Sequence, residues 1–337
     1  MKKIVWQTRS AIVAESIRTG ILSPDANGGN AYDVHAALAI ARDFNLEVSD
    51  AAILRKDDQL LKYWRRMRRD QPVADLIVSE PYPIVFGSRI KSIPSIGMIH
   101  HIDDNLGKSS LKHVWYFDRL KRRLQKLNLV VTVSSYWCDY LENLGCKNVK
   151  IIYNAFDPAD YKVSEQEILK FKTEHGIPEG KALIYAGNAN RQKGIYEVYN
   201  ALKDHGYHLL MSGSRNQAAD LPVQYLHLDR KSYVSMLHAC DLVITMSKMT
   251  EGWNRIAHEA LLCGTPVIGS GIGGMKELLN GGGQLIISQE KDLPDAVKEV
   301  LHRSVWYVEN GKRFIEQFDM EYFRSEWNHT INELIGK

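Results

Sequence analysis

Residues 242–269 read LVITMSKMTEGWNRIAHEALLCGTPVIG. The segments 242–245 and 266–269 are short apolar runs, which are typical of buried β-strands. Residues 256–262 lie between them and are predicted to be helical. A strand, a helix and another strand in this order indicate a β-α-β unit, whose two strands run parallel in one sheet.

The same alternation of strand and helix continues on both sides of this unit. Further strands are predicted at residues 3–7, 46–53, 75–79, 95–99, 129–134, 149–153, 182–186, 208–212, 223–227 and 283–287. Further helices are predicted at residues 31–44, 135–144, 194–202, 231–239, 274–279, 293–301 and, in an aromatic-rich tail, 304–335. This alternation is typical of parallel sheets of the doubly wound type.

A polar segment with a proline, residues 154–158, interrupts the alternation, which then starts again. We therefore predict an α/β protein with two Rossmann-like, doubly wound domains, residues 1–157 and 158–314, that face a cleft. Ligands of such sheets bind outside the carboxyl ends of the strands. With two domains, we expect the ligand to lie in the cleft between them.

The composition excludes several classes of protein. The 337 residues are 45% hydrophobic and 25% charged, which is globular usage and not that of a disordered chain. The four cysteines are scattered and form no C-x-x-C pair, so neither a disulfide scaffold nor a zinc ribbon is expected. Because the first residues form too short an apolar run for a signal peptide, and no stretch approaches the ~18 apolar residues of a membrane span, we expect a cytoplasmic protein.

Positive charge is concentrated in the first half of the chain. Residues 1–157 carry 23 Lys and Arg against 17 Asp and Glu, and two basic runs with aromatic residues occur at 62–69 and 115–126. Such runs suit an anionic membrane surface, which would place the protein at the inner face of a membrane, or they form solvated helix faces. The net charge of +3 is too small to favour nucleic acid as a partner.

Two glutamates, Glu251 and Glu259, form the strongest local motif. The first lies in a loop after a strand and the second lies inside a helix that begins near Asn254 or Arg255. The free N–H groups at such a helix start can hold a phosphate. Carboxylates on either side can accept hydrogen bonds from the paired hydroxyls of a sugar or ribose. The combination suits a nucleotide sugar, and the alternative is one solvated and one helix-capping glutamate.

A second motif, residues 187–194, follows a predicted strand and opens a helix. It reads GNANRQKG and contains Arg191 and Lys193, which can stabilise negative charge on a departing phosphate. The segment lacks the G-K-[ST] ending of a Walker loop and does not match G-x-G-x-x-G. The alternative is a basic loop at the start of a helix.

Two weaker signals lie in the first half. Gly28 and Gly29 follow the first strand and allow a ligand to approach the backbone at a helix start, or they form a plain turn. His100 lies in the run IHHIDD at 99–104, at the end of a strand, where it can position a sugar or move a proton, or can be purely structural. With no D-x-D triplet and no H-E-x-x-H, no metal site is expected.

Taken together, these motifs resemble those of the GT-B glycosyltransferases, specifically the retaining glycosyltransferase family 4. The resemblance covers nearly all of the chain. It includes the glycine pair, His100, Ser134-Ser135, Asn154-Ala155-Phe156-Asp157, the segment 187–194, and the two glutamates of the E-x7-E spacing.

The resemblance implies a role for each matching residue. Gly29 would lie near the donor phosphates and His100 near the transferred sugar, while Lys193 would contact the diphosphate. Glu251 would hold the hydroxyls of the donor sugar, and Glu259 the ribose. The C-terminal helix, about residues 315–337, would pack back on the first domain. The remaining residues expected at the donor are Gly28, Gly187, Asn188, Gly252, Trp253, Asn254, Arg255 and Ile256.

The chain departs from the family pattern in two places. Asn188 stands where the family usually has arginine after the glycine, and Trp253-Asn254-Arg255 stands where it has F-G-L. We expect Arg191 or Arg255 to supply the missing positive charge.

The resemblance implies transfer of a sugar from a nucleotide-diphosphate sugar to a hydroxyl of a glycan, a lipid-linked or a small-molecule acceptor. Configuration would be retained, and neither a metal nor another cofactor would be needed. Two alternatives remain open: a GT-B sugar-nucleotide epimerase or phosphorylase, and a catalytically degenerate partner subunit.

Overall fold

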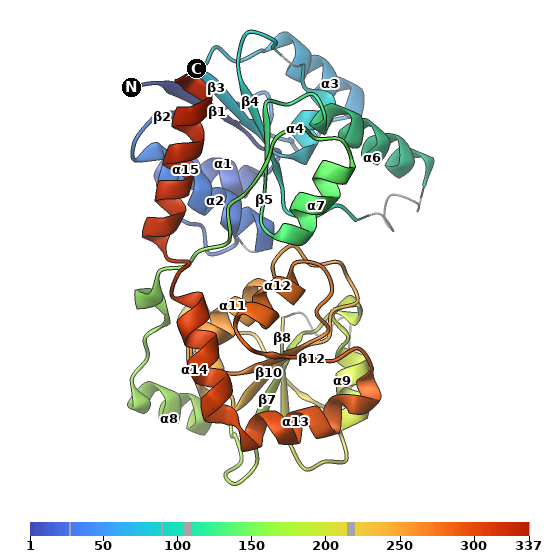
Figure 1. Ribbon diagram of the computed structural model, residues 1–337, viewed down its shortest axis with the longest axis vertical. Helices are drawn as coiled ribbons and strands as arrows, with labels where there is room; N and C mark the ends of the chain where they lie inside the picture. Colours follow the sequence, from blue (N-terminus) through green and yellow to red (C-terminus); the bar gives the residue numbers. More distant parts are fainter. Residues whose placement is uncertain (27, 89, 104–109, 214–219, 337) are drawn as a thin grey trace. The chain divides into compact units, whose positions relative to one another are not determined.

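The computed structural model describes residues 1–26, 28–88, 90–103, 110–213 and 220–336 (Figure 1). The chain forms two compact units, Met1–Ala155 together with Met320–Lys337, and Phe156–Asp319. Each unit contains one six-stranded sheet in which every pair of neighbouring strands is parallel. The predicted α/β class with two doubly wound sheets is therefore confirmed.

The sheet of the first unit has the strand order β2-β1-β3-β4-β5-β6. Its strands are β1 (Lys3–Gln7), β2 (Asn45–Val48), β3 (Leu76–Ser79), β4 (Ser95–Ile99), β5 (Leu129–Thr132) and β6 (Val149–Ile151). The order reverses at β1, so β1 and β3 flank a switch point. In open sheets of this type the carboxyl ends of the strands at that point are where ligands bind.

Helices surround this first sheet. They are α1 (Ala11–Thr19), α2 (Gly28–Ala41), α3 (Leu60–Arg69), α4 (Pro81–Phe86), α6 (Leu111–Leu124), α7 (Ser135–Asn143) and α15 (Met320–Ile335). The last helix of the chain, α15, runs beside α2 (Figure 1). The rings of Tyr32 and Phe323 meet edge to face at 5.2 Å, and Arg324 pairs with Asp43 at 2.7 Å. The C-terminal helix is thereby built into the first unit.

The second sheet has the order β12-β11-β10-β7-β8-β9. Its strands are β7 (Leu183–Asn188), β8 (His208–Ser212), β9 (Gln224–Leu226), β10 (Leu242–Thr245), β11 (Val267–Gly269) and β12 (Leu285–Ile286). Its helices are η1 (Pro158–Tyr161), α8 (Glu165–Glu174), η2 (Arg191–Lys193), α9 (Ile195–Leu202), α10 (Arg230–Ala239), α11 (Arg255–Leu262), α12 (Met275–Gly281), η4 (Glu290–Asp292), α13 (Leu293–His302) and α14 (Ser304–Ile315). The switch point lies between β7 and β10.

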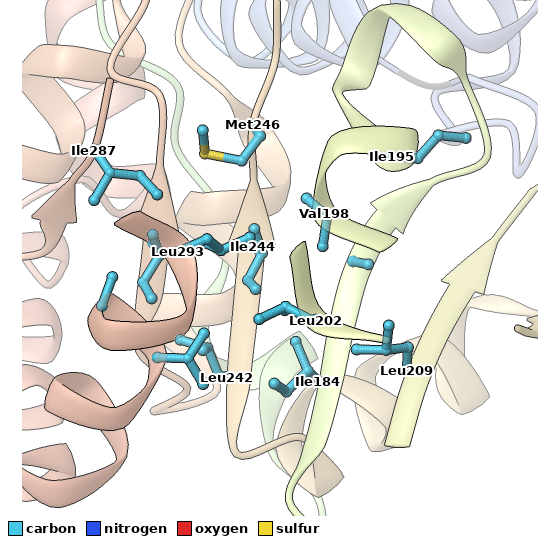
Figure 2. Packing of buried hydrophobic residues seen from close by; sticks show 14 of the residues in the cluster. Ile184, Ile195, Val198, Leu202, Leu209, Leu242, Ile244, Met246, Ile287 and Leu293 are labelled. Carbon is cyan, nitrogen blue, oxygen red and sulfur yellow. The ribbon is translucent and has the colours of Figure 1, made fainter. Parts of the chain in front are cut away.

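Apolar side chains from both central strands and two helices form the core of the second unit. Figure 2 shows Val198 and Leu202 of α9, and Leu293 of α13, gathered around Ile184 of β7 and Ile244 of β10. All five are buried. Because both faces of these strands are covered, their sequences are continuous apolar runs, which is why residues 242–245 can be predicted from sequence.

Two predicted elements need correction. The strand predicted at 46–53 ends at Val48, because the chain turns and the amide of Ala52 bonds to the carbonyl of Ser49. The single helical tail predicted at 304–335 is two helices, α14 and α15. The chain leaves the helical path between them, where the ring of Phe318 is buried against Trp253. No helix in the described ranges is both long and apolar enough to cross a bilayer.

Candidate functional site

The loop after β10 leads into α11 through an unusual backbone turn. Asn254 has φ 74°, the left-handed conformation, which is found at no other non-glycine position in the described part of the chain. Asparagine tolerates this conformation better than most residues. Its side-chain oxygen accepts a hydrogen bond from the amide of Ala257 at 3.0 Å and so caps α11. Asn254 thus keeps the turn that a glycine would make and points the helix start at the carboxyl edge of the sheet.

Lys193 and Glu251 meet at this edge. Lys193 ends η2 after β7, and Glu251 follows β10, the strand next to β7. Their side chains form an ion pair of 2.5 Å, in which the lysine is 31% exposed and the glutamate 13%. Gly194 allows this approach, because a Cβ there would lie 2.0 Å from the carbonyl oxygen of Met246 and the residue has φ 74°. The pair therefore places one cation and one carboxylate at the switch point of the second sheet.

The carboxylate of Glu259 is held by three donors. The hydroxyl of Tyr161 and the guanidinium of Arg230 donate to one oxygen, at 2.9 and 2.8 Å. The hydroxyl of Tyr233 donates to the other at 3.1 Å. A carboxylate has about four acceptor positions, so these three bonds from described residues leave one position for a further hydroxyl. Burial, and then the charge of Glu259, raises the pKa of both tyrosines, which therefore stay protonated donors.

Trp253 and Arg255, on either side of Asn254, make different contacts: Trp253 donates a hydrogen bond to His258, and Arg255 lies over an aromatic ring. The indole of Trp253 is buried and donates a hydrogen bond to Nδ1 of His258 at 3.0 Å. Burial, and then the charge of Arg255, holds the pKa of His258 well below its usual value, so this histidine is neutral. Arg255 lies over the ring of Phe156 at 4.3 Å, and burial lowers its pKa. Trp253 therefore packs in the interior of the unit.

Two other predicted residues, Asn188 and Arg191, lie at the end of β7 and just after it. Arg191 is exposed, lies 4.4 Å over the ring of Tyr196 and donates to its hydroxyl at 3.1 Å. Asn188 ends β7 and lies against Gly213, where a Cβ would come within 2.1 Å of the Asn188 amide oxygen. Gly187 has φ 91°. Arg191, one of the two arginines expected to supply the charge missing at Asn188, thus lies on the surface against Tyr196.

The first unit brings the glycine pair and His100 together. Gly28 begins α2 with φ 51°, and a Cβ on Gly29 would lie 2.9 Å from Cδ2 of His100. Nε2 of His100 lies 2.9 Å from Oδ1 of Asp33, which is buried on the same helix. The sequence motifs do not single out Asp33, although its position four residues after Gly29 places it on the same helix face.

Glu80 is a second residue that the sequence did not reveal. It follows β3, is buried, and accepts hydrogen bonds from the Trp6 indole at 3.1 Å and the Thr8 hydroxyl at 2.7 Å. Burial, and then the nearby charge of Asp33, raises the pKa of Glu80 to about 8. An acidic residue directly after a buried strand is the signal that could have revealed it.

Of the predicted His-Asp run, Asp104 lies outside the described residues.

Comparison with known proteins identifies the chain. Residues 5–160 match the family model of glycosyltransferase family 4, and residues 167–318 match that of glycosyl transferases group 1. The chain belongs to the GT-B glycosyltransferases. The predicted membership of the GT-B glycosyltransferases is therefore confirmed.

Several curated glycosyltransferases are similar in sequence to part of this chain. An uncharacterised glycosyltransferase of Methanocaldococcus jannaschii is 25% identical over 68% of this chain and 66% of its own length. The N-acetyl-alpha-D-glucosaminyl L-malate synthase of Bacillus anthracis is 25% identical over 53% of this chain and 51% of its own. The chain thus spans less than two thirds of the length of these relatives.

Solved structures of glycosyltransferases share the fold over the whole chain. Sucrose-phosphate synthase from Thermosynechococcus elongatus superposes with a TM-score of 0.77 at 15% identity, covering 100% of both chains. Anabaena HepE, solved in complex with UDP-glucose, has a TM-score of 0.72 at 21% identity and covers 99% of this chain and 100% of its own.

Proposed function

We propose that this glycosyltransferase moves a sugar from a nucleotide-diphosphate sugar to a hydroxyl of a glycan, a lipid-linked or a small-molecule acceptor, with retention of configuration and without a metal. The observation that carries the proposal is the Lys193–Glu251 pair beside the capped start of α11. In this scheme the unit Phe156–Asp319 binds the donor, and the unit that contains His100 binds the acceptor.

The donor's charged part matches the cationic side of the site. Lys193 and the amide groups at the start of α11 offer positive charge to a diphosphate, and Arg255 or Arg191 adds a second cation. Stabilising the growing charge of the leaving diphosphate is the largest catalytic contribution that a site of this kind makes. Because Anabaena HepE was solved with UDP-glucose bound, uridine diphosphate sugars are the donors to test first.

The donor's hydroxyls match the carboxylates. Glu251 is the acceptor for hydroxyls of the donor sugar, and Glu259 has one acceptor position open for the ribose. Gly187 and Asn188 end β7, Gly252 lies in the loop after β10, and Ile256 lies in the first turn of α11. We propose backbone contacts with the donor for these residues and for Trp253. On the other unit, Gly28 and Gly29 would lie near the phosphates, and His100, oriented by Asp33, would contact the transferred sugar.

The transfer step balances without an outside reagent. The bond between the anomeric carbon and the phosphate oxygen breaks, and the acceptor oxygen forms a new bond to the same carbon on the same face. The acceptor's proton passes to the phosphate oxygen that leaves. Neither Glu251 nor Glu259 has to act as a nucleophile, since both serve as hydrogen-bond acceptors.

Product analysis tests the proposal. The protein is incubated with UDP-, GDP- and ADP-sugars, with and without a panel of acceptors, and products are identified by mass spectrometry and NMR. The proposal predicts release of nucleoside diphosphate together with an acceptor-linked sugar of unchanged anomeric configuration. A changed nucleotide sugar without an acceptor would favour the epimerase, a sugar phosphate would favour the phosphorylase, and no turnover of any donor would favour the partner subunit.

A further inference from the structure

The first unit contains a cavity whose lining includes none of the residues assigned above to the donor phosphates or the transferred sugar. Its volume is about 310 Å³, which is at the lower end of the ~300–1,000 Å³ typical of small-molecule sites. It is bounded by β3, β4, α4 and the segment that follows α6. The proposed transfer reaction assigns it no role.

Small residues on the sheet leave this space open. Ser79 and Ser95 line the cavity from neighbouring strands, where larger residues would fill it. The Ser79 hydroxyl donates to the side-chain oxygen of Gln7 at 2.8 Å, so its polar group is already satisfied. The lining is mixed: its polar uncharged members are Gln7, Ser79, Ser88 and Ser95, and its apolar members are Ile77, Pro83, Ile84, Ile90, Ile93 and Leu127. The apolar part of the lining can contact a hydrocarbon chain.

Three cations, Lys91, Arg123 and Lys126, lie among the lining residues. Arg123 is fixed in place, since its guanidinium donates to the carbonyl oxygens of Ile84 at 2.6 Å and of Gly87 at 2.5 Å. In the described ranges no carboxylate forms an ion pair with these three cations; nearby carboxylates pair elsewhere, as Asp118 does with Arg122. A partly apolar cavity with positive groups in its lining matches a molecule that has a hydrocarbon part and an anionic head.

Helix α6, which contributes Arg123 to the cavity, and helix α3, which packs on α4, present both cations and exposed apolar groups. Leu60 and Leu61 of α3 are each 50% exposed, and Trp115 of α6 is 46% exposed. Arg119 lies over the ring of Trp115 at 5.6 Å. Burial, and then the like charges of Arg119 and Arg68, lowers the pKa of Arg123 to about 10. Basic residues mixed with exposed leucine and tryptophan are typical of helices that lie on anionic lipid surfaces.

We propose that this cavity binds an anionic membrane lipid, with part of a hydrocarbon chain against the isoleucines and the headgroup phosphate on Lys91, Arg123 and Lys126. The exposed faces of α3 and α6 would then rest on the surrounding membrane. This inference stands apart from the proposed transfer reaction, because neither the cavity nor the two helices hold a residue assigned to it.

Vesicle sedimentation tests the proposal. The full chain is mixed with two kinds of vesicle. One kind contains phosphatidylcholine alone, and in the other one third of the lipid is phosphatidylglycerol. We expect binding only to the anionic vesicles, and a loss of about tenfold or more in K91Q/K126Q, because each lysine near such a surface contributes roughly fivefold. The matched control K291Q/K298Q removes the same charge from the second unit and should bind as the wild type does. Equal binding by K91Q/K126Q and wild type would overturn the proposal.

Titration calorimetry with soluble probes separates the cavity from simple charge attraction. Dodecyl phosphate should bind, while inorganic phosphate and dodecyl maltoside should bind at least tenfold more weakly. S88W places a large ring among the lining residues and should abolish dodecyl phosphate binding. Equal affinity for dodecyl phosphate and inorganic phosphate, or unchanged dodecyl phosphate binding by S88W, would refute a lipid-binding cavity. Nucleotide binding by K91Q/K126Q should stay at the wild-type value, so failure here is distinct from failure of the transferase proposal.

Discussion

The ammonium group of Lys193 lies 2.5 Å from a carboxylate oxygen of Glu251, across two loops that follow neighbouring strands. A diphosphate that binds Lys193 competes with Glu251 for the same ammonium group. Once the pair opens, the oxygen of Glu251 that held Lys193 can accept a hydrogen bond from a sugar. The contact thereby couples recognition of the phosphate half of a donor to recognition of its sugar half.

Removing the cation should weaken all nucleotide binding. In K193Q, we expect the affinity for the best nucleoside diphosphate to fall by about 10–100-fold, since a hydrogen bond to a charged group contributes ~1.5–3 kcal/mol. Titration calorimetry measures the change. K248Q is the matched control, because Lys248 follows β10 as Glu251 does and also pairs with a glutamate, Glu197 of α9. Equal losses in the two variants would show that general charge, and not the position of Lys193, attracts the nucleotide.

Removing the carboxylate should separate the two halves of the donor. E251Q frees Lys193, so we expect its affinity for a nucleoside diphosphate without sugar to stay equal or to rise severalfold. Turnover of the nucleotide sugar should fall by about 10²-fold or more, because removing one preorganised polar contact to a transition state typically lowers kcat by that factor. Binding of the diphosphate and turnover are measured on the same preparation. A variant that lost affinity for the diphosphate as strongly as K193Q does would contradict the competition between Glu251 and phosphate.

Asp33 should act through His100. D33N keeps an oxygen that can accept from the imidazole but removes the charge, so the ring loses part of its orientation. We expect kcat to fall about tenfold while the KM for the donor changes little, because a group that acts on the reacting sugar affects turnover more than binding. D43N is the control, since Asp43 pairs with Arg324 and touches no site residue. If D33N raised the donor KM and left kcat intact, Asp33 would be a binding residue instead.

Glu80 should make stability depend on pH. The folded chain keeps the proton of Glu80 up to a pKa of about 8, whereas the ordinary value is 4.5. Between these values unfolding releases a proton, so the free energy of unfolding falls as pH rises, by at most about 1.4 kcal/mol per pH unit. E80Q cannot lose a proton, so its denaturation midpoint should fall less than that of wild type between pH 5 and pH 8. E47Q, at an exposed position, should follow the wild type; if E80Q does so too, Glu80 is ionised in the folded chain.

Asn254 should be replaceable by glycine but not by alanine. N254G keeps the left-handed turn and loses only the cap, which costs a few tenths of a kcal/mol. N254A loses the cap and strains the backbone, so we expect about 1–3 kcal/mol of destabilisation. Urea denaturation followed by circular dichroism measures both. Equal destabilisation by the two substitutions would show that the cap matters and the backbone conformation does not.

Sequence patterns reveal those elements of the structure that are determined by residues close together in the chain. The unit at 242–269 can be predicted because its strands are continuous apolar runs and its motif lies in one loop. α1 is not predicted, although Ser10 caps it, because the segment is short and follows its strand without a clear turn signal. α8 begins with a capping box at Ser164 but is not predicted either, for want of a pattern beyond it.

Long-range partners cannot be read from the sequence. Glu80 is buried because Trp6 and Thr8, more than seventy residues earlier, bond to it. Glu259 is expected to face a ribose, but nothing near it in the chain indicates that Tyr161 and Arg230 share its carboxylate. Such contacts follow from the order of strands in a sheet, and single-sequence patterns do not determine that order.

Calorimetric titration of the full chain with UDP, GDP and ADP, on wild type and on K193Q, tests whether the edge of the second sheet is a nucleotide-sugar site. We predict that one of these nucleotides binds the wild type with clear preference and binds K193Q at least tenfold more weakly. Absence of binding by all three, or equal binding by wild type and K193Q, would show that the donor binds elsewhere or not at all.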